Sequence, residues 1–491
     1  IKQYLVNAKE LISIILAGIL YVMAFPPFNF KFLIYISLII FLSLILMQSK
    51  KNAMIISFIY GLIIFSLGAS WIFNSIYTYG NGGIVISSII TVIFIFIQSS
   101  YFLIIGFFVN RNNFNHQSRY SIFVPASFFV LVEFVRSYLF TGFPWLIIGY
   151  SQIHTIFDNI YPIFGSYFVS FITIVISTYL AIMFINKKIS IDNKPILLSV
   201  ILIILIFQFN KSWVEDSNES ISFAIIQPNI KQDEKFIVSN LNEIKQRYVL
   251  LSRDIETDLI LMPETALPTV YRSNSSFYRD NIMKKSNSLI SGIFRQDKNY
   301  TFNSMILLDN TEQFYDKRHL VPFGEYTPFE SLLEPLAKIF AIPMSNLSSG
   351  DLDQNIFTFK NFKLIPIICY ESAFPSLIET DDNNYSVIVN VSNDSWFGNS
   401  FAPHQHLQIT QIRAIEFQRN LIRAANTGIS AYINKHGVII KKLNYNTFGV
   451  IQSDIAATKG STPFSRFGHY PVLMLIFIII IFYVARTREH E

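Results

Sequence analysis

Cysteine and charged residues are scarce in this sequence. Cys369 is the single cysteine among 491 residues, which excludes a disulfide bond within the chain and any metal cluster built from several cysteines. Charged residues make up 14%, whereas soluble globular domains carry about 25%. With 52% hydrophobic residues, this shortage excludes a soluble enzyme of ordinary composition and predicts a membrane protein. The formal net charge of +5 is only weak evidence for nucleic-acid binding. It agrees better with basic loops that face an anionic membrane leaflet.

The first apolar segment lacks the cleavage site of a signal peptide. It runs from Leu11 to Phe25, after Lys2 and Lys9, and is followed by Pro26 and Pro27 rather than by a small-x-small motif. We therefore expect it to stay in the chain as a membrane span. Internal repeats are also missing.

Eight apolar segments in total are predicted to cross a membrane, although several are shorter than the about 20 residues that a helical span needs. They are Leu11–Phe25, Phe32–Met47, Ala53–Ile76, Ile84–Val109, Ile122–Leu139, Ile160–Ile185, Ile196–Phe209 and Val472–Val484. A cytoplasmic N-terminus places nearly all basic flanking residues on the cytoplasmic side and little beyond Lys31 outside, as the positive-inside rule demands. The sequence thus predicts a membrane domain of seven spans (1–209), a domain on the outer face (210–469), and a last span with a cytoplasmic tail (470–491). Both termini would lie in the cytoplasm, and the outer domain in the periplasm of a bacterium.

Two charged residues lie within the fifth predicted span. Glu133 and Arg136 are three residues apart, on one helix face, and charges at such depth usually face a bundle interior or a polar cavity. A site for a lipid head group and an internal ion pair that orients the helix both remain open. The segment after them, with Trp145, is predicted to be an interfacial turn with an aromatic anchor.

The polar region alternates strand-like and helical patterns. Its short Ile- and Val-rich runs, bounded by Pro, Asn, Asp or Gly, predict strands, and two longer segments predict helices; this alternation predicts an α/β sheet covered by helices. The expected strands are Ile221–Ile226, Leu259–Met262, Leu289–Phe294, Met305–Leu308, Leu364–Ile368, Val387–Val391 and Ile429–Ile433, and the expected helices are Leu241–Ile255 and His406–Ile422.

Three reactive groups follow predicted strands or lie close to them: Glu264, Lys317 and Cys369. Singly, each has an ordinary explanation, because a lone cysteine packs well as a small hydrophobe and charged groups are usually on the surface. Together they meet the needs of nucleophilic acyl transfer. A thiol needs a base or a nearby cation to become a thiolate, and an ammonium group with a backbone N–H can stabilise the oxyanion.

The motifs around these residues resemble those of a known family. Met262–Ala266, Tyr315–Tyr326 and Cys369–Glu371 are similar to the Glu-Lys-Cys domain of the nitrilase (carbon-nitrogen hydrolase) superfamily. The supporting stretches Ser392–Gly398, Pro403–His406 and Arg423–Ser430, and the membrane-side segments Thr141–Trp145 and Gly149–Gln152, resemble the bacterial apolipoprotein N-acyltransferases. The resemblance implies a membrane α-helical bundle of eight transmembrane helices and an α/β nitrilase-like αββα sandwich.

The same resemblance implies an activity and a set of site residues. The activity is transfer of an acyl chain from a phospholipid, phosphatidylethanolamine in this family, to the α-amino group of the diacylglyceryl-cysteine of an apolipoprotein, without a cofactor. Cys369 would be the nucleophile, Glu264 the general base and acid, and Lys317 the oxyanion partner. The residues implied to support substrate binding are Arg136, Trp145, Phe236, Glu325, Tyr370 and Glu371, with Phe236 standing where family members often have Trp.

Several alternatives stay open at this stage. His404 and His406 are two residues apart without a nearby third ligand, so no metal is expected. The apolar stretches within 330–347 fit either core packing or a lid that dips into the lipid surface. A membrane-tethered nitrilase-like amidase could use the same three groups, and a lipid transporter with a degenerate outer domain would need no thiol.

Overall fold

The computed structural model describes residues 6–79, 83–109, 122–186, 212–283, 287–326, 346–379 and 385–488. The chain divides into two compact units, the first made of residues 1–73, 85–211 and 467–491, and the second of residues 74–84 and 212–466. The predicted span at 196–209 and most of the stretch 330–347 lie outside the described residues.

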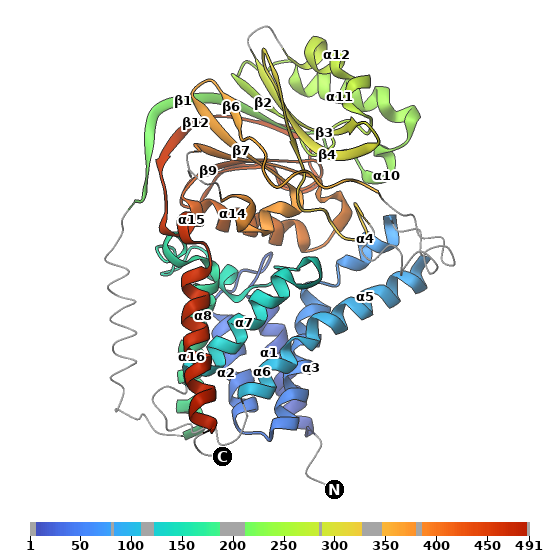
Figure 1. Cartoon of the computed structure of the whole chain (residues 1–491). Coiled ribbons are helices and arrows are strands. Elements are labelled where there is room, and N and C mark those ends of the chain that lie inside the picture. The colour runs from blue at the N-terminus through green and yellow to red at the C-terminus, as the bar shows by residue number, and fades with distance from the viewer. Residues whose placement is uncertain are drawn as a thin grey trace. The chain divides into compact units, whose positions relative to one another are not determined.

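The first unit is built from apolar helices (Figure 1). They are α1 (Ala8–Met23), α2 (Leu33–Leu46), α3 (Lys50–Gly68), α5 (Gly83–Ser100), α6 (Phe102–Val109), α7 (Phe123–Tyr138), α8 (Tyr161–Asn186) and α16 (Tyr470–Arg488). Among the residues that the structure describes, four helical segments are long and apolar enough to cross a membrane: Lys50–Gly68, Gly83–Val109, Phe123–Thr141 and Tyr161–Asn186. Leu33–Leu46 and Tyr470–Ala485 are shorter. The third to sixth predicted spans therefore correspond to helices of sufficient length, and the total of eight stays a prediction.

An irregular segment follows α7, and the two charged residues of that helix hold its backbone. The Ile148 N–H donates to Glu133 Oε1 at 2.7 Å, and Arg136 Nη1 donates to the Phe143 carbonyl at 2.6 Å. Backbone groups that leave a helix in an apolar environment need such partners. No direct ion pair joins Glu133 and Arg136 in this described segment, where both side chains bind backbone groups instead, and a site for a lipid head group stays open.

Trp145 of the same segment is buried inside the first unit. Its side chain is 1% exposed and packs against Phe143 and Trp71, with ring centroids 5.7 Å and 5.5 Å away. Neighbouring aromatic rings therefore cover the indole, and its place at a membrane interface stays a prediction.

The second unit contains two six-stranded sheets. The first has the order β12 (Gly449–Gly460), β1 (Val214–Gln227), β2 (Leu259–Leu261), β3 (Ser288–Asp297), β4 (Tyr300–Leu308), β5 (Glu312–Asp316). The second has the order β11 (Ile439–Lys442), β10 (Ala431–Ile433), β9 (Asn420–Ala425), β8 (Val387–Ser392), β7 (Phe362–Ile368), β6 (Phe357–Phe359). Strands β1 to β3 are parallel, as are β7 to β9, so the functional groups that follow β2 and β7 leave from strand ends where open α/β sheets place their chemistry.

The two sheets pack face to face and helices cover their outer faces (Figure 1). Side chains of both sheets, such as Phe223, Leu261, Leu364 and Val389, form one buried core between them. Helix α11 (Leu241–Ser252) packs on the outer face of the first sheet and α14 (Ala402–Phe417) on that of the second. The predicted αββα sandwich is confirmed.

One predicted helix is wrong at its end. The segment predicted as one helix to Ile422 ends at Phe417, because Gln418 adopts a left-handed conformation with φ of 46°. The chain then enters β9, a strand buried along its whole length. Because β9 is buried on both faces and contains Asn420 and Arg423, it lacks the alternation of a half-buried strand, and periodicity alone does not separate it from a buried helix.

Candidate active site

Cys369 occupies a sharp bend between β7 and the 3-10 helix η6 (Cys369–Ala373). Its φ of 51° is in the left-handed region, which costs a non-glycine residue about 1–2 kcal/mol. The Ile368 N–H donates to Glu371 Oε2 at 2.7 Å, which ties the bend to a side chain two residues further on. Strand and bend together fix where the thiol lies, and only 7% of the residue is exposed.

Lys317 follows β5 directly and is buried, with 1% exposed. Its Nζ lies 2.8 Å from Glu325 Oε2 and 3.4 Å from Glu264 Oε1. The ordinary explanation of a solvated loop charge is therefore wrong, and two of the residues predicted for the site bind this ammonium group.

Glu264 lies in the loop after β2 and is 5% exposed. The backbone here passes close to Gly292 of β3, where an added Cβ would lie 2.4 Å from Glu264 Cα. Oε1 accepts from Asn303 and Lys317, whereas Oε2 is buried and has no hydrogen-bond partner among the described residues. This unpartnered oxygen suits a general base, because it can accept a proton from a reacting group.

Asn303 of β4 joins the two carboxylates and was not singled out from the sequence. Its Nδ2 donates to Glu264 Oε1 at 2.7 Å and to Glu325 Oε1 at 2.6 Å. The Val321 N–H also donates to Glu325 Oε2. Asn303 lies two residues before the apolar run Met305–Leu308. A polar residue leading into a buried strand is a sequence signal that could have found it, since buried polar groups need partners.

The charges of these groups act on the thiol. Burial and the Glu264 carboxylate raise the pKa of Cys369, while the Lys317 ammonium opposes this shift. Burial would lower the pKa of Lys317, but the carboxylates of Glu325 and Glu264 outweigh it and raise the value above that of an ordinary lysine. Lys317 is therefore a permanent cation near Cys369, and Glu264, Lys317 and Cys369 are brought together as predicted.

Glu371 connects the Cys369 bend to the loop after Lys317. Besides the Ile368 N–H, its carboxylate accepts from the Tyr315 hydroxyl at 3.0 Å and from the Arg318 N–H at 2.7 Å. Burial raises the pKa of Glu371, and these hydrogen bonds oppose the rise. The carboxylate thus fixes the ends of β5 and β7 relative to each other.

The other predicted supporting residues lie at more open positions. Tyr370 is half-buried and packs edge-on against Phe374, with ring centroids 5.1 Å apart. Phe236 is 49% exposed and follows Lys235, a buried lysine whose Nζ donates to Glu264 O and Thr265 Oγ1. Burial lowers the pKa of Lys235 to about 8.

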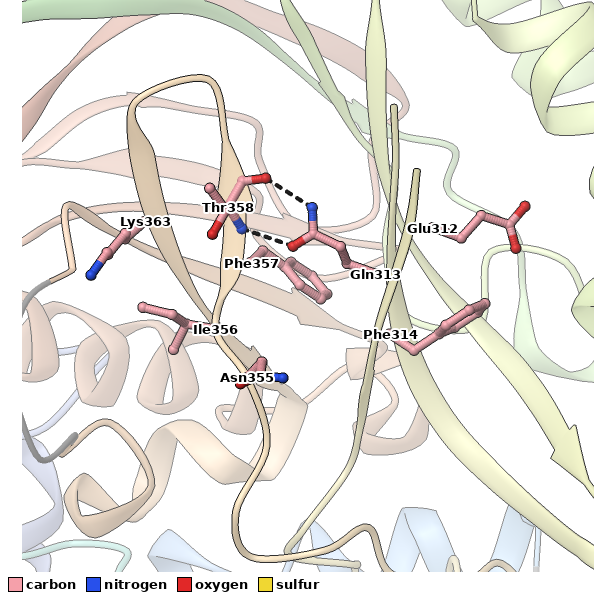
Figure 2. A pocket seen from close by; sticks show the side chains of 8 residues that line it. All are labelled: Glu312, Gln313, Phe314, Asn355, Ile356, Phe357, Thr358 and Lys363. Carbon is pink, nitrogen blue, oxygen red and sulfur yellow. Dashed lines mark hydrogen bonds between the residues drawn. The ribbon is translucent and has the colours of Figure 1, made fainter. Parts of the chain in front are cut away.

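A group of possible metal donors and a cavity in the second unit do not define another site. Donor atoms of Cys369, Asp394 and His406 lie within 4.8 Å of one another, but Asp394 already binds Arg423 and His406. A cavity of about 610 Å³ opens at the edges of the two sheets, lined by residues of β5 and β6. Figure 2 shows that the Gln313 amide makes two hydrogen bonds there with the Thr358 backbone. None of the three reactive groups lines it.

Two family models match this chain. Residues 17–179 match the apolipoprotein N-acyltransferase N-terminal domain, and residues 223–463 match carbon-nitrogen hydrolase. The apolipoprotein N-acyltransferase of Coxiella burnetii is 34% identical over 485 residues, covering 95% of this chain and 98% of that protein. The chain belongs to the apolipoprotein N-acyltransferase family. The apolipoprotein N-acyltransferase of Pasteurella multocida is 32% identical, and the match covers 95% of this chain and 93% of that protein.

Membership of the apolipoprotein N-acyltransferase family confirms the resemblance found in the sequence motifs. A solved CN-hydrolase superfamily protein of Xanthomonas campestris is 17% identical, with a TM-score of 0.37, and covers 48% of this chain and 91% of that protein. The apolipoprotein N-acyltransferase N-terminal model covers the helices of the first unit from the middle of α1 to most of α8.

Proposed function

We propose that this protein is an acyltransferase that moves an acyl chain from a phospholipid to the α-amino group of the S-diacylglyceryl-cysteine at the N-terminus of an apolipoprotein. The observation that carries the proposal is the buried thiol of Cys369 beside a carboxylate with a free oxygen and a permanent ammonium. The family membership and the apolar helices of the first unit support lipid substrates. Phosphatidylethanolamine is the proposed donor.

In the first step, Cys369 Sγ attacks the ester carbonyl of the phospholipid. Oε2 of Glu264 accepts the thiol proton as the S–C bond forms, and the negative oxygen of the tetrahedral intermediate is stabilised by the Lys317 ammonium and a backbone N–H. The C–O bond then breaks, Glu264 returns the proton to the leaving oxygen, and a lysophospholipid departs. The acyl chain remains on Cys369 as a thioester.

In the second step, the amine of the apolipoprotein attacks the thioester. Glu264 removes a proton from the amine, the C–S bond breaks, and the thiol form of Cys369 is restored once the proton is passed back. Lys317 again faces the developing oxyanion. The site is nearly closed to solvent, with Cys369 at 7% and Lys317 at 1% exposure, and this burial protects the thioester from hydrolysis.

The supporting residues have proposed roles that follow from their positions. Glu325 holds the Lys317 ammonium, Glu371 holds the Cys369 bend, and Tyr370 and Phe236 present aromatic faces to substrate. Arg136 and Trp145 of the first unit are proposed to support lipid binding on the membrane side.

The proposed location is the inner membrane of a bacterium. Eight spans would leave both termini in the cytoplasm and the domain at 210–469 in the periplasm, with membrane segments at 1–209 and 470–491. The positive-inside distribution of Lys and Arg and the four helices of sufficient length support this arrangement.

One experiment tests the reaction. The full-length protein in detergent micelles is incubated with phosphatidylethanolamine that carries a labelled acyl chain, and a hydroxylamine-labile label on Cys369 is expected. A diacylglyceryl-cysteine peptide should then discharge the label into an amide. If wild type carries no label, or Cys369→Ala carries as much, the proposal is wrong. Release of ammonia from small amides without any lipid adduct would favour the tethered amidase instead.

A further inference from the structure

A buried polar cluster adjoins Cys369, and no step of the reaction described above uses it. It consists of Ser372, Asp394, His406 and Arg423, none of which is exposed to solvent. Buried charged groups are expensive to desolvate unless their partners are well placed. The cluster therefore needs an explanation beyond packing.

His406 of α14 contacts the Cys369 bend at two points. Its Nε2 lies 3.1 Å from the Cys369 carbonyl oxygen and 2.9 Å from Ser372 Oγ. When Nε2 carries no proton, it accepts from the Ser372 hydroxyl; when it is protonated, it donates to the Cys369 carbonyl. In both forms the ring binds η6.

Asp394 and Arg423 hold this ring in place. Asp394 Oδ1 accepts from His406 Nδ1 at 2.9 Å, and Arg423 Nη2 donates to Asp394 Oδ2 at 2.8 Å. Burial alone would raise the pKa of Asp394, but Arg423 and His406 hold it well below its usual range. The surroundings are tight, since a Cβ added at Gly428 would lie 2.3 Å from Asp394 Oδ2. The carboxylate is therefore a fixed anion that orients the imidazole.

The left-handed backbone of Cys369 is thus held on both sides. Glu371 binds the N–H of Ile368, before the cysteine, and His406 binds the turn that follows the cysteine. Because Asp394 accepts the proton of Nδ1, Nε2 of the neutral ring accepts from the Ser372 hydroxyl, and it donates to the Cys369 carbonyl only when the ring is doubly protonated. A strained residue keeps its conformation only when its surroundings over-determine it. We propose that His406, oriented by Asp394 and Arg423, is a positioning residue that fixes the backbone of Cys369, so that its thiol meets the ester carbonyl at the correct angle. This inference rests on the acyl transfer proposed above.

The ring is not placed to act as the base. Its Nδ1 is engaged by Asp394 and its Nε2 by the Cys369 bend, whereas Glu264 offers an oxygen with no described partner. Loss of His406 should therefore lower the rate of acyl transfer without changing the reactivity of the thiol towards a small reagent. A misplacement of about 1 Å can lower a rate up to about 100-fold.

The test compares His406→Ala and His406→Gln with wild type in two assays. The first measures single-turnover formation of the Cys369 thioester from labelled phosphatidylethanolamine at increasing concentrations. The second measures alkylation of Cys369 by iodoacetamide between pH 6 and pH 10, by intact mass, which is unambiguous because the chain has one cysteine. The matched control is His404→Gln, two residues earlier on α14, whose side chain makes no described hydrogen bond to the Cys369 bend.

The expected result separates orientation from chemistry. At saturating phospholipid, thioester formation should fall about 10- to 100-fold in His406→Ala, with an unchanged half-saturating concentration and alkylation within about threefold of wild type. His406→Gln, whose amide can still form a hydrogen bond with the Ser372 hydroxyl, should recover most of the rate, and His404→Gln should match wild type.

Three results would overturn the inference: an unchanged rate of thioester formation in His406→Ala, an equal loss in both assays, or an equal loss in His404→Gln. If His406→Ala does not fold, His406→Gln and Asp394→Asn decide by the same criteria. These outcomes are distinct from a failure of the proposed function, which would be shown by wild-type protein that forms no thioester.

Discussion

Replacing Lys317 by methionine should lower both the rate of acyl transfer and the stability of the protein. Methionine keeps most of the side-chain volume but removes the ammonium that lies 2.8 Å from Glu325 and 3.4 Å from Glu264. Loss of one oxyanion partner typically lowers a rate about 100- to 1000-fold, so thioester formation on Cys369 should fall by that factor. The same change leaves two buried carboxylates that share the Asn303 amide.

The stability effect of Lys317→Met follows from those two carboxylates. Removing one partner of a buried ion pair costs about 3–5 kcal/mol, because the remaining charge is uncompensated. Repulsion between the two carboxylates is relieved when one of them binds a proton, so the variant should lose less stability at pH 5 than at pH 8. Wild type should show no such loss in this range: the pKa of Lys317 is raised, so its contribution is present below about pH 10.4 and is lost only above it.

A double variant separates the two effects. Lys317→Met with Glu325→Gln removes the excess negative charge, so thermal unfolding should recover much of the lost stability while thioester formation stays low. Thermal melts at pH 5 and pH 8 and single-turnover acylation measure both quantities. If Lys317→Met forms the thioester at the wild-type rate, Lys317 is not the oxyanion partner. If the double variant is less stable than Lys317→Met, the electrostatic argument is wrong.

Three other predictions concern the carboxylate side of the site. Glu264→Gln removes a charge that raises the pKa of Cys369, so the midpoint of iodoacetamide alkylation should move to lower pH while acyl transfer is lost; a midpoint at higher pH would contradict the assigned shift. Gly292→Ala puts a Cβ within 2.4 Å of Glu264 Cα, so thioester formation should fall at least about tenfold and thermal stability by about 1–3 kcal/mol. The control Gly449→Ala meets only the Leu443 side chain and should be milder; equal effects would refute the close-approach argument. Asn303→Leu removes the donor shared by two carboxylates, so acylation should slow while the protein stays folded, and an unchanged rate would show that this bridge is dispensable.

The sequence singled out Cys369 and Glu264 because each lies beyond a strand with a recognisable apolar pattern, β7 and β2. Lys317 follows β5, which has no such pattern, and was singled out through the motif around it. Short or polar strands were missed, among them β5 and β6, since three to five residues with mixed polarity give no clear period.

The parts that the sequence could not predict depend on contacts between distant segments. Asn303 is an ordinary strand residue until β4 places it between Glu264 and Glu325. Trp145 follows a pattern typical of a membrane interface, yet neighbouring rings bury it. The sequence could not show whether Glu133 and Arg136 bind each other or the backbone that follows α7, because spacing on a helix says nothing about partners outside it. In the structure, Glu133 accepts from that backbone and Arg136 donates to it.

The Gln313 side chain has a consequence for how this domain behaves among many copies of itself. β6 is the outermost strand of its sheet, and its free edge could recruit a strand from another molecule. The Gln313 amide occupies both the N–H and the carbonyl of Thr358, at 2.8 Å each (Figure 2). It copies the pairing that an incoming strand would make, so this part of the edge is already satisfied. One glutamine thereby opposes edge-to-edge association of copies at this strand.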